Sequence, residues 1–167
     1  ILDTARVDAM ESVADEFGFI ERVDSIRSLG STSSEWLAKT FTTEYKSEIS
    51  NTALISANPH VQNTLYDRPF PEHDKDAFFS FTNWNTVQPR DFEYIEQPWQ
   101  YATHERYAHV LPEDMTDRAV SFYREHNPDR MIVHYMQPHR PHMAQAYEED
   151  RELTEAERDP FTYLKNG

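Results

Sequence analysis

The stretch MIVHYMQPHRPH, residues 131–142, decides the fold predicted from this sequence. Its first six residues are apolar apart from one histidine, a pattern typical of a buried strand, and prolines and histidines follow in a stiff loop. The preceding residues 112–126 begin with Pro-Glu-Asp, place apolar side chains at helical spacing and end at Asn127-Pro128. A helix followed directly by a buried strand indicates one unit of an α/β sheet.

Other short apolar runs predict the remaining strands. The run ALISA, residues 53–57, is closed by Asn58-Pro59 and predicts a second buried strand. Residues 1–3, ILD, and residues 92–99 predict two more. The alternation of strands and helices favours an α/β fold with a mostly parallel sheet and helices on both faces, in which sites collect at the carboxyl ends of the strands.

Four further segments carry weaker periodic patterns. Helices are expected over residues 7–17 and from a cap at Ser33 or Ser34. Residues 19–26 alternate loosely, as a strand does, and residues 145–158 predict one solvated helix.

The chain is expected to form one partial domain over residues 1–167. Residues 66–91 hold prolines and scattered charges without a sustained period, so we expect an irregular insertion there. The sequence opens inside a predicted strand and closes after an acidic stretch, so we expect it to be truncated at both ends.

Charge and composition exclude several classes of partner. Sixteen Lys and Arg residues against 30 Asp and Glu residues give a formal net charge of -14, which repels nucleic acid. Such acidity suits a halophilic protein, and a solvated acidic face on an ordinary cytoplasmic protein is the alternative. Cysteine is absent, and no apolar run approaches the roughly 20 residues of a membrane span. We therefore expect no thiolate site, no membrane segment in this chain and a cytoplasmic location.

Two polar positions lie where ligands bind in such folds. Asp3 ends the first predicted strand, where its carboxylate would hold a hard divalent cation or cap a helix. The loop GSTSS, residues 30–34, precedes a helix whose free N–H groups and positive dipole end favour an anionic ester. A hydroxyl of this loop is a candidate nucleophile if a metal or base activates it, and a helix cap is the alternative.

His134, His139 and His142 form the strongest local signal of chemistry. Imidazoles ligate metals, donate a proton to a leaving oxygen or bind an oxyanion. A zinc cluster built on His139 and His142 is a rival interpretation, and His134 is expected to be a satisfied buried histidine. The remaining histidines share no spacing and are expected at the surface without a role; they are His60, His73, His104, His109 and His126.

The order of these parts resembles the sulfatase branch of the alkaline-phosphatase-like superfamily over essentially the whole chain. The opening ILDTARVD, residues 1–8, is similar to that family's strand ending in a metal-binding Asp. The segment VHYMQPHRPH, residues 133–142, resembles the family's Pro-His-x-Pro segment. The resemblance implies an alkaline-phosphatase-like fold and a divalent metal ion, Ca, Mg, Mn or Zn, with Asp3 as a ligand.

The same resemblance assigns the other site residues. Residues 30–37 fall where the family places its nucleophile, with Thr32 as first choice and Ser31 as second, and Thr32 would also bind the metal. His139 would contact the ester, and Arg6 and Arg140 would bind the substrate. The loop lacks the Pro-Ser-Arg pattern of sulfatases, so we expect a plain hydroxyl rather than formylglycine.

The function implied is hydrolysis of a small anionic ester, a sulfate or phosphate monoester, by the complete parent. The family's later Asp-His-Gly motif has no counterpart in residues 143–167. We therefore expect the chain alone to bind divalent cations weakly and to turn over no substrate. Two alternatives stay open, a non-catalytic anion-binding protein of the same fold and a phosphotransferase.

Overall fold

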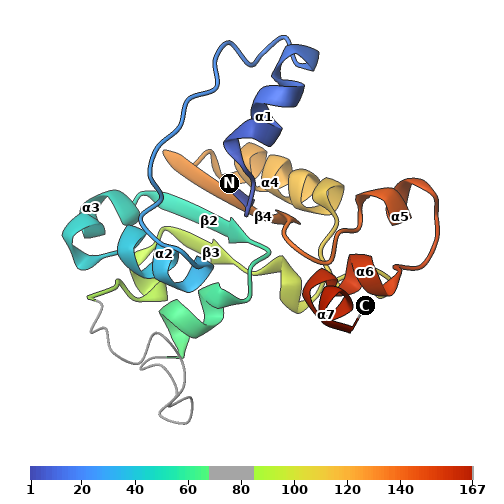
Figure 1. The fold of residues 1–167 in the computed structure, drawn as a ribbon. Coiled ribbons are helices and arrows are strands. Elements are labelled where there is room, and N and C mark those ends of the chain that lie inside the picture. The colour runs from blue at the N-terminus through green and yellow to red at the C-terminus, as the bar shows by residue number, and fades with distance from the viewer. Residues whose placement is uncertain (68–84, 167) are drawn as a thin grey trace.

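A four-stranded parallel sheet forms the centre of the structure, a computed structural model that describes residues 1–67 and 85–166 (Figure 1). The strand order is β1-β4-β2-β3, and every neighbouring pair is parallel. The strands are β1 (Leu2–Asp3), β2 (Thr52–Ser56), β3 (Tyr94–Glu96) and β4 (Arg130–Pro138). The predicted α/β class is confirmed, and the strands present their carboxyl ends at one edge of the sheet.

Helices and helical turns fill the connections between the strands. The α-helices are α1 (Val7–Val13), α2 (Ser33–Thr40), α3 (Lys46–Ile49), α4 (Pro112–His126), α5 (Ala144–Glu148), α6 (Glu155–Arg158) and α7 (Pro160–Asn166). The tighter or wider turns are η1 (Ala14–Glu16), η2 (Thr43–Tyr45), η3 (Gln62–Tyr66), η4 (Pro89–Asp91) and η5 (Pro98–Gln100). Among these described helices, none is long and apolar enough to cross a membrane.

Strand β2 supplies side chains to two hydrophobic cores, one on each face of the sheet. Leu54 packs in a core with Leu37 of α2 and Leu65 of η3, whereas Ile55 packs in a second core with Met115 of α4. Successive side chains of a strand point to opposite faces, so a fully buried strand contributes to both layers. Helices therefore cover both faces of the sheet, as predicted.

Helix α4 and strand β4 follow the predicted boundaries closely. Pro112 occupies the first turn with two acidic residues after it, which suits the positive end of the helix dipole. Asn127 ends the helix in the left-handed conformation (φ 45°), and its N–H donates to the Tyr123 carbonyl. The chain then reverses directly into β4, which pairs with β2 on one side and β1 on the other.

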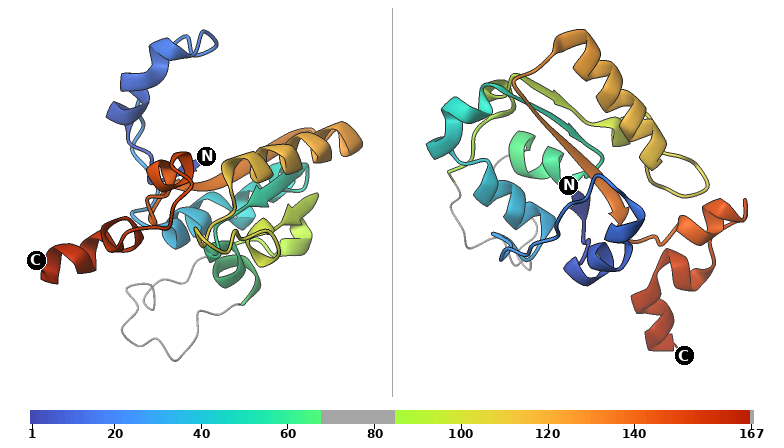
Figure 2. Two further views of the ribbon diagram at one scale, coloured as in Figure 1. Left: turned by 90° about the vertical axis from the view of Figure 1, so that its right-hand side faces the viewer. Right: turned by 90° about the horizontal axis from the view of Figure 1, so that it is seen from above.

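The predicted strand at residues 19–26 is wrong. This segment is extended but pairs with no described strand, and it leaves Phe19 81% and Ile26 94% exposed. Together with α1 it projects away from the sheet (Figure 2). Because the segment lies away from the sheet, no strand pairs with it and its loose alternation of apolar and polar residues does not produce a strand.

The predicted single helix over residues 145–158 is also wrong. The chain forms α5 and α6 instead, separated by a turn in which Asp150 has a positive φ of 48°. Thr154 restarts the helix by a capping box with Glu157. The segment is not wholly solvated either, because Ala146 and Leu153 are buried in a third small core.

The expected insertion at residues 66–91 lies mostly outside the described residues, as does His73. Its described end is ordered and packed. Thr86 forms a bridge with Thr42, and Val87 is buried in the core that contains Leu54. Residues 85–91 therefore belong to the sheet-covering layer rather than to an irregular excursion.

Candidate functional site

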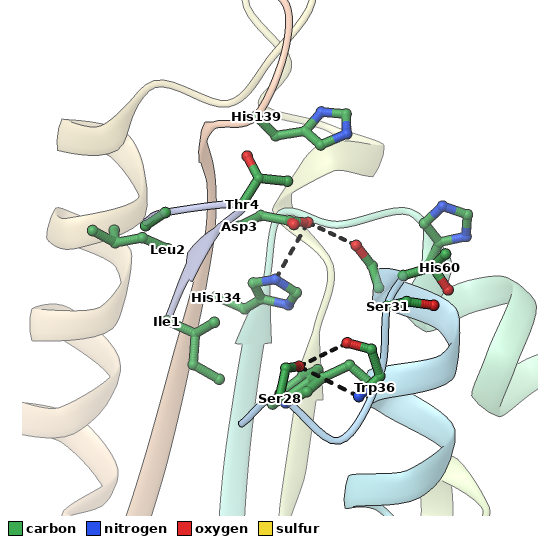
Figure 3. Close-up of a pocket in the computed structure, with 14 residues that line it drawn as sticks. Ile1, Leu2, Asp3, Thr4, Ser28, Ser31, Trp36, His60, His134 and His139 are labelled. Carbon is green, nitrogen blue, oxygen red and sulfur yellow. Dashed lines mark hydrogen bonds and ion pairs between the residues drawn. The ribbon is translucent and has the colours of Figure 1, made fainter. Parts of the chain in front are cut away.

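A cavity of about 580 Å³ opens at the carboxyl edge of the sheet, where β1, β4 and the start of α2 meet (Figure 3). Asp3 ends β1, Ser33 begins α2, and His60 and His139 follow β2 and β4. The lining residues are Ile1, Leu2, Asp3, Thr4, Ala5, Ser28, Gly30, Ser31, Thr32, Ser33, Trp36, His60, His134 and His139. The structure thus gathers Asp3, the 30–34 loop and His139 around one hollow.

Asp3 is the buried anion of this cavity, only 9% exposed. Its Oδ2 accepts hydrogen bonds from Ser33 Oγ (3.0 Å) and Asn58 Nδ2 (2.5 Å), and His134 Nε2 lies 3.7 Å away. Burial alone would raise the pKa of Asp3, but the interactions with His134 and Ser33 and the nearby His139 outweigh it and lower that pKa. Asp3 is therefore held ionised, and it caps no helix.

Ser33 is the hydroxyl of the 31–33 segment that contacts Asp3. Thr32 Oγ1 accepts from the Glu35 N–H (3.2 Å), so Thr32 is the cap of α2 in place of the predicted Ser33 or Ser34. Ser31 Oγ donates to Glu35 Oε2 (2.8 Å). Both predicted nucleophiles thus have local partners on Glu35, and their catalytic role stays a prediction.

Gly30 lets the loop pass close to the first turn of α2. A Cβ atom at this position would lie 2.3 Å from the backbone N of Trp36. Any other residue would therefore push the loop away from the helix. The close approach fixes where the following hydroxyls enter the cavity.

Asn58 connects the end of β2 to Asp3. It is 1% exposed; its amide nitrogen donates to Asp3, and its Oδ1 accepts from the His60 N–H (2.8 Å). The His60 ring is fixed in turn by Ser34, whose Oγ lies 2.8 Å from His60 Nδ1. One buried amide therefore sets the positions of both the carboxylate and the His60 loop.

His134 is the buried, satisfied histidine that its position in β4 predicts. Its Nδ1 lies 3.2 Å from Ser56 Oγ, and Ser56 Oγ accepts from the Asn58 N–H (3.2 Å). Because Nε2 faces the Asp3 carboxylate, the proton belongs on Nε2, and Nδ1 accepts from Ser56. The ring orients Asp3 rather than facing a ligand.

Three more histidines, His60, His109 and His139, interact electrostatically with Asp3. Loss of water around the rings lowers the pKa of His60 and of His109. Asp3 raises both pKa values and His139 lowers them; at His60 the effect of Asp3 is the larger, and at His109 that of His139. His60 keeps an exposed edge, so its shift is the more strongly screened of the two. His139 Nδ1 donates to the Arg140 carbonyl (2.8 Å), which leaves Nε2 free for a ligand.

The other predicted substrate-binding residues point elsewhere. Arg6 pairs with Asp8 at the surface (2.8 Å), and Arg140 pairs with Asp159 (2.9 Å). Neither lines the cavity, so their contact with substrate stays a prediction. His142 likewise lies in a different hollow from Asp3.

The donors around Asp3 do not by themselves suit a divalent cation. Hard cations take six or more oxygen ligands, commonly with two or more carboxylates. Within residues 1–67 and 85–166, no group of three His, Cys, Asp or Glu side chains is placed to hold a metal ion. Asp3 offers one carboxylate, and Asn58 turns its nitrogen toward the site, so further ligands would be required.

Sequence reasoning missed Ser33, Asn58 and His60 as members of the site. Asn58 and His60 follow β2 as His139 follows β4, so their position after a buried strand was an available signal. Ser33 lies one residue from the predicted nucleophile, and its direction depends on where the helix starts.

Comparison with known proteins gives no match for this chain: no family model, no curated protein and no solved structure is detectably similar to it. What the cavity does is therefore argued from its own side chains.

Proposed function

We propose that this cavity binds the anionic group of a sulfate or phosphate monoester and belongs to a sulfatase-like hydrolase of alkaline-phosphatase-like fold. The observation that carries the proposal is the contact of Ser33 Oγ with the buried Asp3 carboxylate, 3.0 Å apart, at the start of α2. A hydroxyl in that place lies beside the positive end of a helix dipole, where an anion is favoured.

The side chains around Ser33 have two different roles: some orient its hydroxyl, and others would bind the ester. Asp3 holds the Ser33 hydroxyl by accepting its hydrogen bond, and His134 holds Asp3. The ester oxygens would lie on the other side of Ser33, toward His60 and His139, because the Asp3 charge repels them. When the ring is protonated, His139 Nε2 can donate to an ester oxygen or to the leaving oxygen.

Ser33 is our preferred nucleophile, in place of Thr32 or Ser31. Its hydroxyl donates to the buried Asp3 carboxylate of the cavity, whereas Ser31 donates to Glu35 and Thr32 accepts from the Glu35 N–H. The lowered pKa of Asp3 makes that carboxylate a weak base. Ser33 would thus need additional activation, and we expect the isolated chain to bind the ester without turning it over.

A non-catalytic anion-binding protein is the second candidate. It is favoured by the single carboxylate at the site among the described residues. The two functions differ in whether a divalent metal ion changes the outcome. Anion binding that persists unchanged in a chelator, with no product formed after Mg²⁺ or Mn²⁺ is added, would favour the binding protein.

The test is a titration of the 167-residue chain with inorganic phosphate and sulfate, followed by NMR signals of the histidine rings. We expect the His60 and His139 signals to shift, and Ser33→Ala and His139→Ala to weaken binding. Ser47→Ala is the matched control, because its exposed hydroxyl contacts Glu48 outside the cavity. Equal affinity in all three variants would contradict the proposal, and rapid hydrolysis of 4-nitrophenyl phosphate would contradict the expected inactivity.

A further inference from the structure

A second cavity, of about 450 Å³, adjoins the first across His139, which lines both. It lies between the start of α4, the loop after β4 and helices α5 and α6. Its volume falls in the range of small-molecule sites. A ligand whose anionic group faces His139 from the first cavity would extend its remainder into this one.

The walls of the second cavity combine apolar surface with carboxylates. Apolar contact comes from Pro112, Pro138, Pro141, Met143 and Tyr147, and the acidic residues are Glu113, Glu148 and Glu157. Such a wall suits a compact apolar or aromatic group rather than a sugar, which needs many polar partners.

Two of the three carboxylates keep their negative charge unpaired. Glu157 is neutralised by Arg151 through two hydrogen bonds of 2.7 Å. Glu113 accepts a hydrogen bond from the Tyr147 hydroxyl, a neutral partner, and this contact raises the pKa of Tyr147. Among the described residues, no cation pairs with Glu113 or Glu148 in the ion pairs of the structure.

Gln137 adds an unused acceptor to the same wall. Its Nε2 donates to the Val110 carbonyl (2.9 Å), while its Oε1 is buried and has no hydrogen-bond partner among the described residues. A buried acceptor without a donor is costly, but this oxygen is closed to the cavity, so the preference for a cation rests on the two carboxylates.

We propose that the second cavity binds the alcohol part of the ester and that this alcohol is an apolar or aromatic group carrying an ammonium. The proposal rests on the function proposed for the first cavity and names its substrate class. The ammonium is attracted by Glu113 and Glu148 and by the face of Tyr147. The anionic end and the cationic end of the substrate then lie on opposite sides of His139.

Three probes of equal shape test the charge preference of this cavity without the ester. They are 3-phenylpropylammonium, 3-phenylpropanol and 3-phenylpropionate, titrated into the 167-residue chain at low ionic strength. We expect the ammonium to bind most tightly and the carboxylate most weakly. We expect Glu113→Gln combined with Glu148→Gln to weaken ammonium binding roughly tenfold, the scale of two exposed ion pairs, and to leave alcohol binding unchanged.

Two further variants guard against indirect effects. Glu125→Gln, at an exposed position near the far end of α4, removes a charge without touching the cavity and should leave all three affinities unchanged. Ala144→Trp places a large side chain in the cavity wall and should weaken all three probes. Equal affinities for the ammonium and the carboxylate, or an unchanged preference in the double glutamine variant, would overturn the proposal.

The phosphate monoester of 3-aminopropylphenol separates the two proposals. Both proposals are supported if this ester binds more tightly than its free alcohol, with the gain lost in Ser33→Ala, and also more tightly than the phosphate monoester of 3-propylphenol, which lacks the ammonium. If the ammonium preference holds but the phosphate adds no affinity, the function of the first cavity fails while the second stands. If phosphate adds affinity but the ammonium does not, the second cavity fails alone.

Discussion

Replacing Asn58 by alanine removes the side chain that joins Asp3 to the end of β2. The lost hydrogen bonds are one from the amide nitrogen to a carboxylate and one from the His60 N–H to the amide oxygen. A hydrogen bond to a charged group contributes about 1.5–3 kcal/mol and a neutral one about 1 kcal/mol. Because Asn58 is buried, water does not replace these partners, and we expect the free energy of unfolding to fall by roughly 3 kcal/mol.

The loss should also appear in the ionisation of Asp3. With one donor fewer, the charged form is less favoured, so the pKa of Asp3 should rise from its lowered value. Urea unfolding followed by tryptophan fluorescence measures the stability, and carboxyl NMR shifts against pH measure the pKa. Asn63→Ala is the matched control, since Asn63 is exposed on η3. A stability loss no larger than that of Asn63→Ala, or an unmoved Asp3 pKa, would refute this account of the site.

Three other perturbations have defined outcomes. Gly30→Ala should shift the loop away from Trp36 and weaken the Ser33 contact with Asp3, and a raised pKa of Asp3 would reveal this. Gly18→Ala is the control, and its retained stability would show that the effect is local to the loop. Because the pKa values of His60 and His109 are lowered in the folded state, these rings take up protons in the unfolded chain first as the pH falls. Their contribution to stability is therefore complete above pH 6.5 and is lost as the pH falls below it. Urea midpoints that do not decrease from pH 7.5 to 5.5 would contradict this. Glu96→Ala should lower the free energy of unfolding by about 2 kcal/mol because a buried carboxylate that accepts from two tyrosines and an arginine is removed, whereas exposed Glu93→Ala should change it little.

The fold was predictable where burial is two-sided and continuous. Residues 53–57 and 131–136 are apolar apart from Ser56 and His134 because both faces of β2 and β4 are covered, and such runs have few alternative explanations. Residues 19–26 and 145–158 misled for the opposite reason. Their sequence patterns were weak, so tertiary structure decided the outcome. Residues 19–26 found no strand to pair with, and a turn at Asp150 divided residues 145–158.

The site was predictable only to the level of segments. Asp3, the 30–34 loop and His139 each end or begin an element, and parallel strands bring such ends to one edge. Which hydroxyl faces Asp3 depends on the residue at which α2 begins, because each step along a helix turns a side chain by about 100°. A cap at Thr32 turns Ser33 toward Asp3, and a cap one residue later would have changed the assignment.

The net charge of -14 constrains what the site can bind as strongly as the cavity does. This negative surface repels a small dianion within the electrostatic screening length, which is about 10 Å at moderate ionic strength. High salt removes that barrier but also weakens the local attraction of His60 and His139 for the anion. An ester that also carries an ammonium has a smaller net charge, so it meets less long-range repulsion and gains attraction from Glu113 and Glu148. The acidic surface and the paired cavities are therefore consistent with one substrate class, and an anion without the cationic group should associate more slowly at low salt.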